Sequence, residues 1–382
     1  MRVYLDHNAT SPLRDEVVEA MTRVLRGVHG NPSSIHEEGR SARAAVDRAR
    51  ESVASLIGVE AEDVLFTAGA TEANNTALLG LARARAGTAR HLVTSAAEHP
   101  SVEAPLEVLE REGWRVTRVG VDSEGQLDEA QFEESIESET ALVSILWANN
   151  ETGVLQPMQR VAALARERGI SIHVDATQAV GKVPVDLQDV PIDFLSLSAH
   201  KFNGPKGVGC LIARGDPAFE PILCGGPQER GRRGGTENVA AIVGLGVACE
   251  LAEEELPDRM HDYAGLRDRL WEGIHAKIPS VRRNGSADRM LPNTLNVEFE
   301  GVVGELLLQA LDVEGIAASS GAACHSGSIE PSNVLIAMGR SPESARASLR
   351  FSVGHGNDAT QLDYALSRLP DLVERARRAV GA

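Results

Sequence analysis

The chain has 382 residues and a formal net charge of −17, since 38 Lys and Arg stand against 55 Asp and Glu. This charge argues against a nucleic-acid-binding protein, because phosphate neutralisation needs clustered Lys and Arg. An apolar content of 42% is typical of a folded globular protein, and the length predicts two or three domains. No run of 18 apolar residues occurs and the first residues show no secretory or transit composition, so we expect no membrane span and a cytoplasmic location.

Short apolar or β-branched runs alternate with helical patterns between about residue 13 and residue 255. The predicted strands, in chain order, are Val64–Thr67, Leu92–Ser95, Val116–Val121, Ala141–Trp147, Ile172–Asp175 and Phe194–Ser198. Helices are predicted over Thr71–Ala82, whose apolar residues share one face, and over Pro157–Arg168, which starts at a proline and stops before a glycine. This alternation indicates an α/β fold with a mostly parallel sheet covered on both faces, which binds ligands at the carboxyl ends of its strands.

The pattern changes after about residue 255. A long helical stretch runs to about Ala276, and the further predicted elements are the strands Asn293–Glu298, Ile316–Ser320 and Ser348–Val353 and the helices near Val303–Leu311 and from Ala359. This succession predicts a smaller α+β domain. We therefore expect a large domain of residues 13–255 and a small domain formed by residues 1–12 and 256–382.

The four cysteines contain no CxxC pair, so we expect no structural zinc site and no other metal site. In a reducing compartment all four should be free thiols. Cys210, Cys224 and Cys249 lie among apolar residues or glycines, which favours inert packing roles. Cys324 lies in a run of small residues beside His325, where an exposed thiolate could form, although an incidental loop cysteine fits the composition equally well.

Polar residues that follow predicted strands are the first candidates for a site. Asp175 ends an apolar strand, where a buried carboxylate needs a partner, although an Asp before Ala-Thr-Gln is also typical of a helix N-cap. Lys201 directly follows a buried strand and precedes a glycine turn, so burial could lower its pKa and make its amine reactive. A solvated loop lysine is the alternative interpretation of Lys201.

The segment Thr67–Asn75 consists of small residues that follow a strand and open a helix. Its exposed amides could bind phosphate, although it is neither a Walker loop nor a GxGxxG pattern. A phosphate cradle, an acid at a strand end and a buried lysine together suggest pyridoxal phosphate. This coenzyme needs an amine for its aldehyde, an anion for its ring nitrogen and donors for its phosphate. A reactive thiol in addition suggests chemistry on sulfur.

Ten stretches carry a family resemblance, and they are Tyr4–Thr10, Gly30–His36, Gly69–Asn75, Glu98–Pro100, Asn149–Gly153, His173–Gln178, Ser198–Lys201, Gly234–Asn238, the Cys324 loop with Glu330–Ser332, and Ser348–Ser352. In this order they resemble the cysteine desulfurases of the NifS/IscS type, within the fold-type I, class V aminotransferase-like group of pyridoxal-phosphate enzymes. The resemblance implies a seven-stranded, mostly parallel sheet in the large domain. It also implies conversion of L-cysteine to L-alanine, with the sulfur passing through an enzyme persulfide to an acceptor protein.

The resemblance also implies residue roles. Lys201 would bind the coenzyme aldehyde and move a proton, Asp175 would face the ring nitrogen, and Gln178 would donate to the ring hydroxyl oxygen. His99 would stack on the ring and help to move protons, and Cys324 would be the nucleophile. The phosphate would be held by Ala70, Thr71, Ser198 and His200, with Thr236 contributed by the second subunit of a homodimer. Asn150, which is also expected to border the coenzyme, would bind the substrate carboxylate together with Arg350.

Some alternatives stay open. Ala-Cys-His-Ser around Cys324 is similar to selenocysteine lyases, so that activity is the closest alternative. Another class V enzyme, such as an aminotransferase, would not need Cys324, and a non-catalytic sulfur-relay or scaffold protein would keep the fold without the coenzyme. Iron–sulfur cluster assembly, tRNA thiolation, cofactor synthesis and the modification of another macromolecule are all possible destinations of the sulfur.

Overall fold

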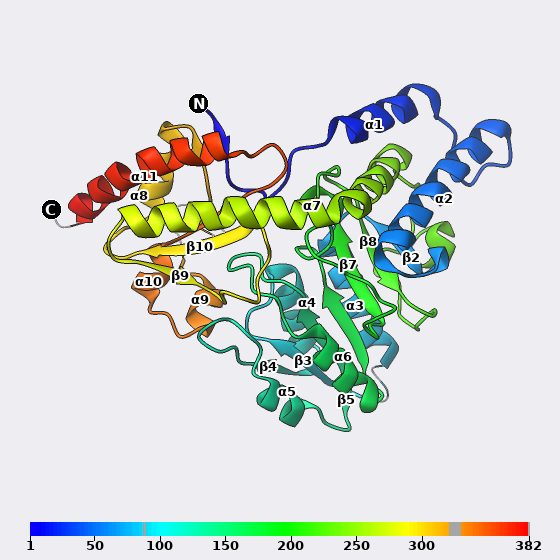
Figure 1. Ribbon diagram of the computed structural model, residues 1–382. Helices are drawn as coiled ribbons and strands as arrows, with labels where there is room; N and C mark the ends of the chain where they lie inside the picture. The colour runs from blue at the N-terminus through cyan, green and yellow to red at the C-terminus, as the bar shows by residue number, and fades with distance from the viewer. Residues whose placement is uncertain (86, 88, 321–329, 381–382) are drawn as a thin grey trace.

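The computed structural model describes residues 1–85, 87, 89–320 and 330–380, and Figure 1 shows a large sheet beside a smaller group of strands and helices. The large sheet has seven strands in the order β2 (Val64–Thr67), β8 (Gly209–Ala213), β7 (Phe194–Ser198), β6 (Ser171–Asp175), β5 (Thr140–Leu146), β3 (His91–Ser95) and β4 (Arg115–Val119). Only β8 runs antiparallel to its neighbours. The six strands predicted for this sheet are confirmed to within two residues at each end, and β8 is a strand that no predicted range covered.

Both faces of this sheet are covered, as predicted. Leu65 points to a core with α3 (Ala70–Arg85) and α4 (Pro100–Arg111), whereas Val64 and Phe66 point to the opposite core. That second core includes residues of α1 (Asp15–Gly27), α2 (Glu37–Ile57), α5 (Glu129–Ser135), α6 (Met158–Glu167) and α7 (Val239–Lys277). Alternate residues of a strand face opposite sides, so a sheet buried on both sides needs a continuous apolar run.

The smaller part of the molecule has its own apolar core. An antiparallel sheet contains β12 (Ser348–Ser352), β10 (Thr294–Phe299) and β9 (Val281–Asn284), and a parallel pair contains β1 (Val3–Tyr4) and β11 (Ile316–Ala317). The helices of this part are α8 (Gly304–Val313), α9 (Asn333–Ala337), α10 (Pro342–Arg346) and α11 (Ala359–Val380). The first residues of the chain therefore lie among the last third of the sequence, as Figure 1 shows.

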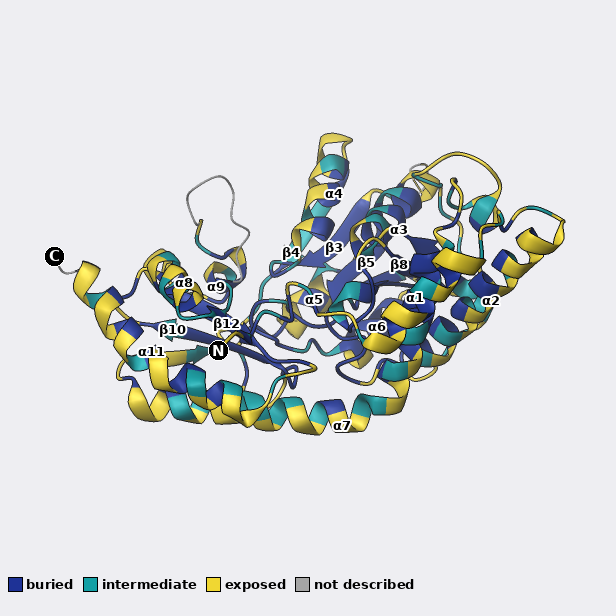
Figure 2. Cartoon of the chain, turned by 90° about the horizontal axis from the view of Figure 1, so that it is seen from above, coloured by how far each residue is buried: buried dark blue, intermediate teal, exposed yellow. Residues whose placement is uncertain are grey.

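One helix, α7, connects the two parts. Its 39 residues correspond to a length of about 58 Å at 1.5 Å per residue. It contacts α1 and α2 on the large sheet and α11 in the smaller part, and Figure 2 shows its exposed outer face along the edge of the molecule. The predicted helical stretch thus begins earlier than expected, at Val239, and Pro257 lies inside it. The domain boundary at residue 255 stays a prediction. Among the residues that the structure describes, no helix has both the length and the apolar character that crossing a bilayer requires.

Candidate active site

A cavity of about 1050 Å³ opens where the carboxyl ends of β5, β6 and β7 meet the first turns of α3 and α4. Ten of the twelve residues predicted from the sequence line it, and they are Ala70, Thr71, His99, Asn150, Asp175, Gln178, Ser198, His200, Lys201 and Arg350. Thr236 does not line this cavity, and Cys324 lies outside the described residues. The sequence therefore predicted ten of the 27 described residues that line the cavity.

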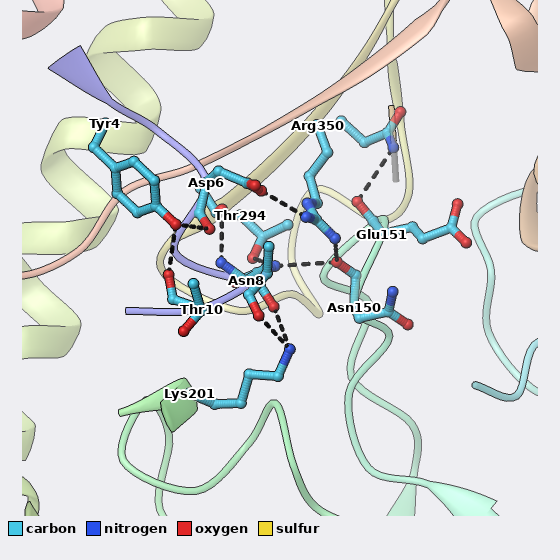
Figure 3. Close-up of polar contacts among 12 residues, drawn as sticks. Tyr4, Asp6, Asn8, Thr10, Asn150, Glu151, Lys201, Thr294 and Arg350 are labelled. Atoms are coloured by element: carbon cyan, nitrogen blue, oxygen red, sulfur yellow. Dashed lines mark hydrogen bonds and ion pairs between the residues drawn. The ribbon is translucent and has the colours of Figure 1, made fainter. Parts of the chain in front are cut away.

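Lys201 supplies the amine of the cavity. It follows β7 in the short 3-10 turn Ala199–Lys201, and its Nζ donates to the backbone oxygens of Asn8 at 2.7 Å and Ala9 at 2.9 Å, as Figure 3 shows for Asn8. Burial, assisted by the nearby Arg350 cation, lowers the pKa of Lys201 to about 8. An amine with this pKa is uncharged in a usable fraction near neutral pH, which a nucleophilic lysine requires.

Asp175 supplies the buried carboxylate, at the end of β6. Its Oδ1 accepts from the backbone N–H of Thr177 at 3.0 Å, and its Oδ2 accepts from Asn74 Nδ2 at 2.8 Å. No helix follows Asp175 before β7 in the part of the chain that the structure describes, so the helix N-cap interpretation is wrong, although one oxygen holds the turn that comes next. Both donors are neutral, so the carboxylate lines the cavity as an acceptor held in one orientation.

The first turn of α3 forms a cradle of amide groups beside Lys201. Amides in a first helical turn lack intrahelical acceptors, so Ala70 and Thr71 present donors to an anion. Gly209, which is paired with Ser198, allows the loop before α3 to approach, since a Cβ on Gly209 would lie 2.8 Å from Gly69 Cα. His200 completes this wall, and burial lowers its pKa to about 4, so its ring is neutral.

Asn8 is one of the site residues that the sequence interpretation missed. It is buried, and its backbone oxygen accepts from both Lys201 Nζ and Gln178 Nε2, the latter at 2.9 Å. Its side-chain oxygen accepts from the buried Lys182 Nζ at 3.0 Å, and the same Nζ donates to Gln178 Oε1 at 2.5 Å. Asn8 thus fixes the orientation of two predicted site residues. The only sequence signal was its place inside the family motif Tyr4–Thr10.

Arg350 supplies a guanidinium on β12, opposite Lys201. Its Nη2 donates to Asp6 Oδ1 at 2.7 Å and its Nη1 donates to the backbone oxygen of Asn150 at 2.9 Å, as Figure 3 shows. Its Nε is buried and has no hydrogen-bond partner. A fixed guanidinium with a free donor can bind a carboxylate. The structure brings Asn150 and Arg350 together, as predicted.

His99 is the N-cap of α4, and its Nδ1 accepts from the backbone N–H of Ser101 at 3.1 Å. Burial lowers the pKa of His99, and the positive charge of Lys201 lowers it further, while Asp175 has the opposite effect. The ring therefore lines the cavity as a neutral group.

The chain on each side of Cys324 is tied to this cavity, although Cys324 itself and His325 lie outside the described residues. Ser319 lines the cavity and exchanges two backbone hydrogen bonds with Arg350. Ser332 is buried, and its hydroxyl donates to the carboxylate of Glu151, another residue of the cavity wall.

The remaining cysteines correct one prediction. Cys210 and Cys249 are buried, and burial raises the pKa of both thiols, which agrees with inert packing roles. Cys224 is exposed, so the packing interpretation was wrong there. Its neighbours Gly225 and Gly226 have no side chains that could cover it.

Thr236 is exposed on a loop that follows Arg233, whose guanidinium pairs with Glu72 of α3 at 2.9 Å. The loop is thus held beside the amide cradle while Thr236 itself lies outside this chain's cavity. A role toward a second subunit stays a prediction.

Known proteins resemble this chain over nearly its whole length. The sequence profile of the aminotransferase class-V family matches residues 3–365. A cysteine desulfurase of Enterobacter agglomerans is 48% identical over 376 residues, which cover 98% of this chain and 93% of that protein. A cysteine desulfurase IscS of Dictyoglomus turgidum is 43% identical, covering 98% of this chain and 95% of that protein. A solved structure of a NifS-like protein is 36% identical and superposes with a TM-score of 0.93, covering 98% of this chain and 100% of that one.

Proposed function

This chain belongs to the class V aminotransferase family as a pyridoxal-phosphate-dependent cysteine desulfurase, and we propose how its cavity performs that activity. L-cysteine is converted to L-alanine, and its sulfur passes to Cys324 and then to an acceptor protein. The observation that carries the proposal is the position of Lys201 and Asp175. They follow neighbouring strands and line one cavity beside a cradle of amides, so amine, carboxylate and anion site face the same space.

The residues of the cavity fit pyridoxal phosphate. The lowered pKa of Lys201 gives a reactive amine for its aldehyde, and the fixed carboxylate of Asp175 suits a protonated ring nitrogen. Gln178 would donate to the ring hydroxyl oxygen. The phosphate would lie against the amides of Ala70 and Thr71, with the side chains of Ser198 and His200 beside it. When bound, the coenzyme stores the electrons released at the substrate's α-carbon.

Lys201 and Cys324 divide the chemistry between them. With the substrate bound, the free amine of Lys201 would remove the proton from the substrate's α-carbon. The Cys324 thiolate would then attack the substrate sulfur, and the S–S bond of a persulfide would form as the Cβ–Sγ bond of the substrate breaks. The electron pair of that bond stays with the carbon skeleton, which takes up a proton and leaves as L-alanine. Ser319 lies on the cavity wall, and five residues of extended chain span at most about 18 Å, a length that would allow the Cys324 thiol to reach the cavity.

Arg350 and Asn150 would bind the substrate carboxylate, which gives a direct kinetic test of the proposal. The parent enzyme should release alanine from L-cysteine and gain one sulfur atom. Arg350→Ala should raise KM for L-cysteine about ten- to a hundredfold, because a charge-assisted, two-point contact of roughly 1.5–3 kcal/mol is lost. Coenzyme binding should persist, since Arg350 lies on the wall opposite the amide cradle.

Arg350→Lys is the matched control, because it keeps the charge and removes the planar fork. It should give an intermediate KM. A KM for Arg350→Ala within twofold of the parent would place the carboxylate site elsewhere and leave Arg350 as the partner of Asp6.

We also propose a homodimer whose two active sites each contain Thr236 of the other subunit. The exposed position of Thr236 supports this, as do the exposed apolar side chains of Leu25 and Ile35. Thr236→Asp should repel phosphate in the partner's site and abolish activity, whereas Thr236→Ser should keep it. Mixing Thr236→Asp with Lys201→Ala should restore about a quarter of the parental sites, because half of the dimers are mixed and each has one intact site. A fully active monomer in sedimentation would contradict the dimer.

We also propose a sulfur acceptor, a cellular location and a domain division for the enzyme. The acceptor is a protein, and iron–sulfur cluster assembly is the destination suggested by the relatives named IscS. The three described cysteines are unpaired, which suits a cytoplasmic enzyme. We retain the division into a large domain of residues 13–255 and a small domain of residues 1–12 and 256–382, with separate cores on the two sides.

A further inference from the structure

A chain of hydrogen bonds runs along the cavity wall and joins His99 to Asp175. Asn74 Nδ2 donates to Asp175 Oδ2 at 2.8 Å and also to Ser101 Oγ at 2.8 Å. Ser101 Oγ in turn lies 2.7 Å from His99 Nδ1. Asn74 is fully buried, and Ser101 is buried except where it lines the cavity.

Asp175 determines which groups donate and which accept in this series of hydrogen bonds. A carboxylate only accepts, so Asn74 must turn its amide nitrogen toward it, and the second hydrogen of that nitrogen reaches Ser101 Oγ. The flipped amide would bring two oxygens together. The cost of this orientation is visible in Asn74 Oδ1, which is buried without a hydrogen-bond partner.

The donor and acceptor roles at His99 follow from its contacts with Ser101. Ser101 Oγ, which accepts from Asn74, still has its own proton to donate to His99 Nδ1. The backbone N–H of Ser101 points to the same nitrogen at 3.1 Å, since His99 caps α4. Two donors leave Nδ1 as an acceptor, which places the proton of the neutral ring on Nε2.

The charges around His99 also disfavour its protonated form. The first turn of α4, a helix of 12 residues, carries partial positive charge, and Lys201 adds to it. Asp175 acts in the opposite direction. The neighbouring Glu98 contributes little negative charge, because burial raises its pKa to about 8.

We propose that Ser101 and Asn74 are positioning residues that hold His99 as a neutral imidazole with its proton on Nε2, so that it meets the cavity as an N–H donor and not as a proton acceptor. Removal of the substrate's α-proton then falls to Lys201 alone. The meaning for catalysis rests on the function proposed above, whereas the protonation state of His99 is a property of the protein without coenzyme.

The test is ¹⁵N NMR of the histidine rings in coenzyme-free protein, with His99 assigned by its loss in His99→Gln. His99 Nε2 should give the protonated-nitrogen shift and Nδ1 the lone-pair shift, and the ring should still be neutral at pH 6.5, the ordinary histidine pKa. A protonated Nδ1, or an imidazolium at that pH, would overturn the proposal. Neither outcome depends on desulfurase activity.

Two variants separate positioning from packing. Ser101→Ala removes one of the two donors to Nδ1. The ratio of the tautomer protonated on Nε2 to the tautomer protonated on Nδ1 should therefore fall roughly three- to tenfold, and the pKa of His99 should rise. Ser101→Thr keeps the hydroxyl and should restore the parental shifts. Unchanged shifts in Ser101→Ala would show that the backbone N–H alone determines the tautomer of His99, and the Ser101 side chain would then have no positioning role.

Discussion

Lys201→Ala is expected to abolish turnover of L-cysteine and the covalent attachment of coenzyme together. The reason is that attachment needs a primary amine in the cavity, and the burial that lowers the pKa of Lys201 to about 8 makes it the reactive one. Borohydride treatment followed by peptide mass spectrometry should find coenzyme on Lys201 in the parent and on no lysine in the variant. Coenzyme should still bind reversibly through the amide cradle.

Two other lysines serve as controls. Lys206 lines the same cavity and is exposed, so Lys206→Ala should keep attachment and turnover. Lys182 is buried and bonded to Asn8 and Gln178, so it is not free to react. Coenzyme trapped on Lys206 or Lys182 in Lys201→Ala would contradict the assignment of Lys201 as the lysine that binds the coenzyme.

The pH dependence of coenzyme capture gives an independent measurement of the pKa of Lys201. Only the uncharged amine reacts, so the capture rate of coenzyme-free parent enzyme should rise about tenfold per pH unit below pH 8 and level off above it. An ordinary lysine would continue to gain rate up to a pKa near 10.4. A rate still rising tenfold between pH 9 and 10 would contradict the lowered pKa.

Cys324→Ser is expected to stop sulfur transfer while coenzyme and substrate still bind. The variant keeps Lys201, Asp175 and the amide cradle, so it should remain yellow. A hydroxyl is not ionised at neutral pH, whereas a thiol with a pKa of about 8.5 is a few per cent thiolate. Single-turnover alanine release should therefore fall by orders of magnitude, and mass spectrometry should find no added sulfur.

Cys224 makes a control necessary, because it is the exposed cysteine among those that the structure describes. Cys224→Ser should keep full activity, and the double variant should behave as Cys324→Ser alone. Near-normal alanine from Cys324→Ser with L-cysteine would refute the mechanism. If that variant still processed L-selenocysteine but not L-cysteine, the enzyme would be a selenocysteine lyase, since selenium leaves without a thiol acceptor more readily.

The sequence predicted those parts of the molecule whose signals are local. The strands that end at Asp175 and Ser198 are short apolar runs, and residues that follow buried parallel strands must meet at one edge of the sheet. The strand β8 escaped prediction because it directly follows the glycine-rich turn after Lys201 and itself begins with a glycine. The exposure of Cys224 could not be inferred from its neighbours, since glycines occur in buried and exposed loops alike.

The missed site residues depend on distant partners. Asn8 bonds to Thr294 and Asn150, which are 286 and 142 residues away, and Asp6 pairs with Arg350 across 344 residues. No spacing rule covers such separations. Lys182 was missed for another reason, because a lysine in a helical turn is usually solvated, and only the folded structure shows that this one is buried.

The contacts of the first residues with β11 and β12 set the order in which the enzyme can mature. Val3 pairs with Ile316 and Asn8 bonds to Ser352, so the wall that holds Lys201 needs both ends of the chain. At 5–20 residues per second, the ribosome adds the intervening residues over about 17–70 s. For that time the amino terminus has its partners on the large sheet but lacks those on β11 and β12, so the carbonyl acceptors of the active lysine are held from one side only. Coenzyme capture is therefore a late event that reports completion of the whole polypeptide.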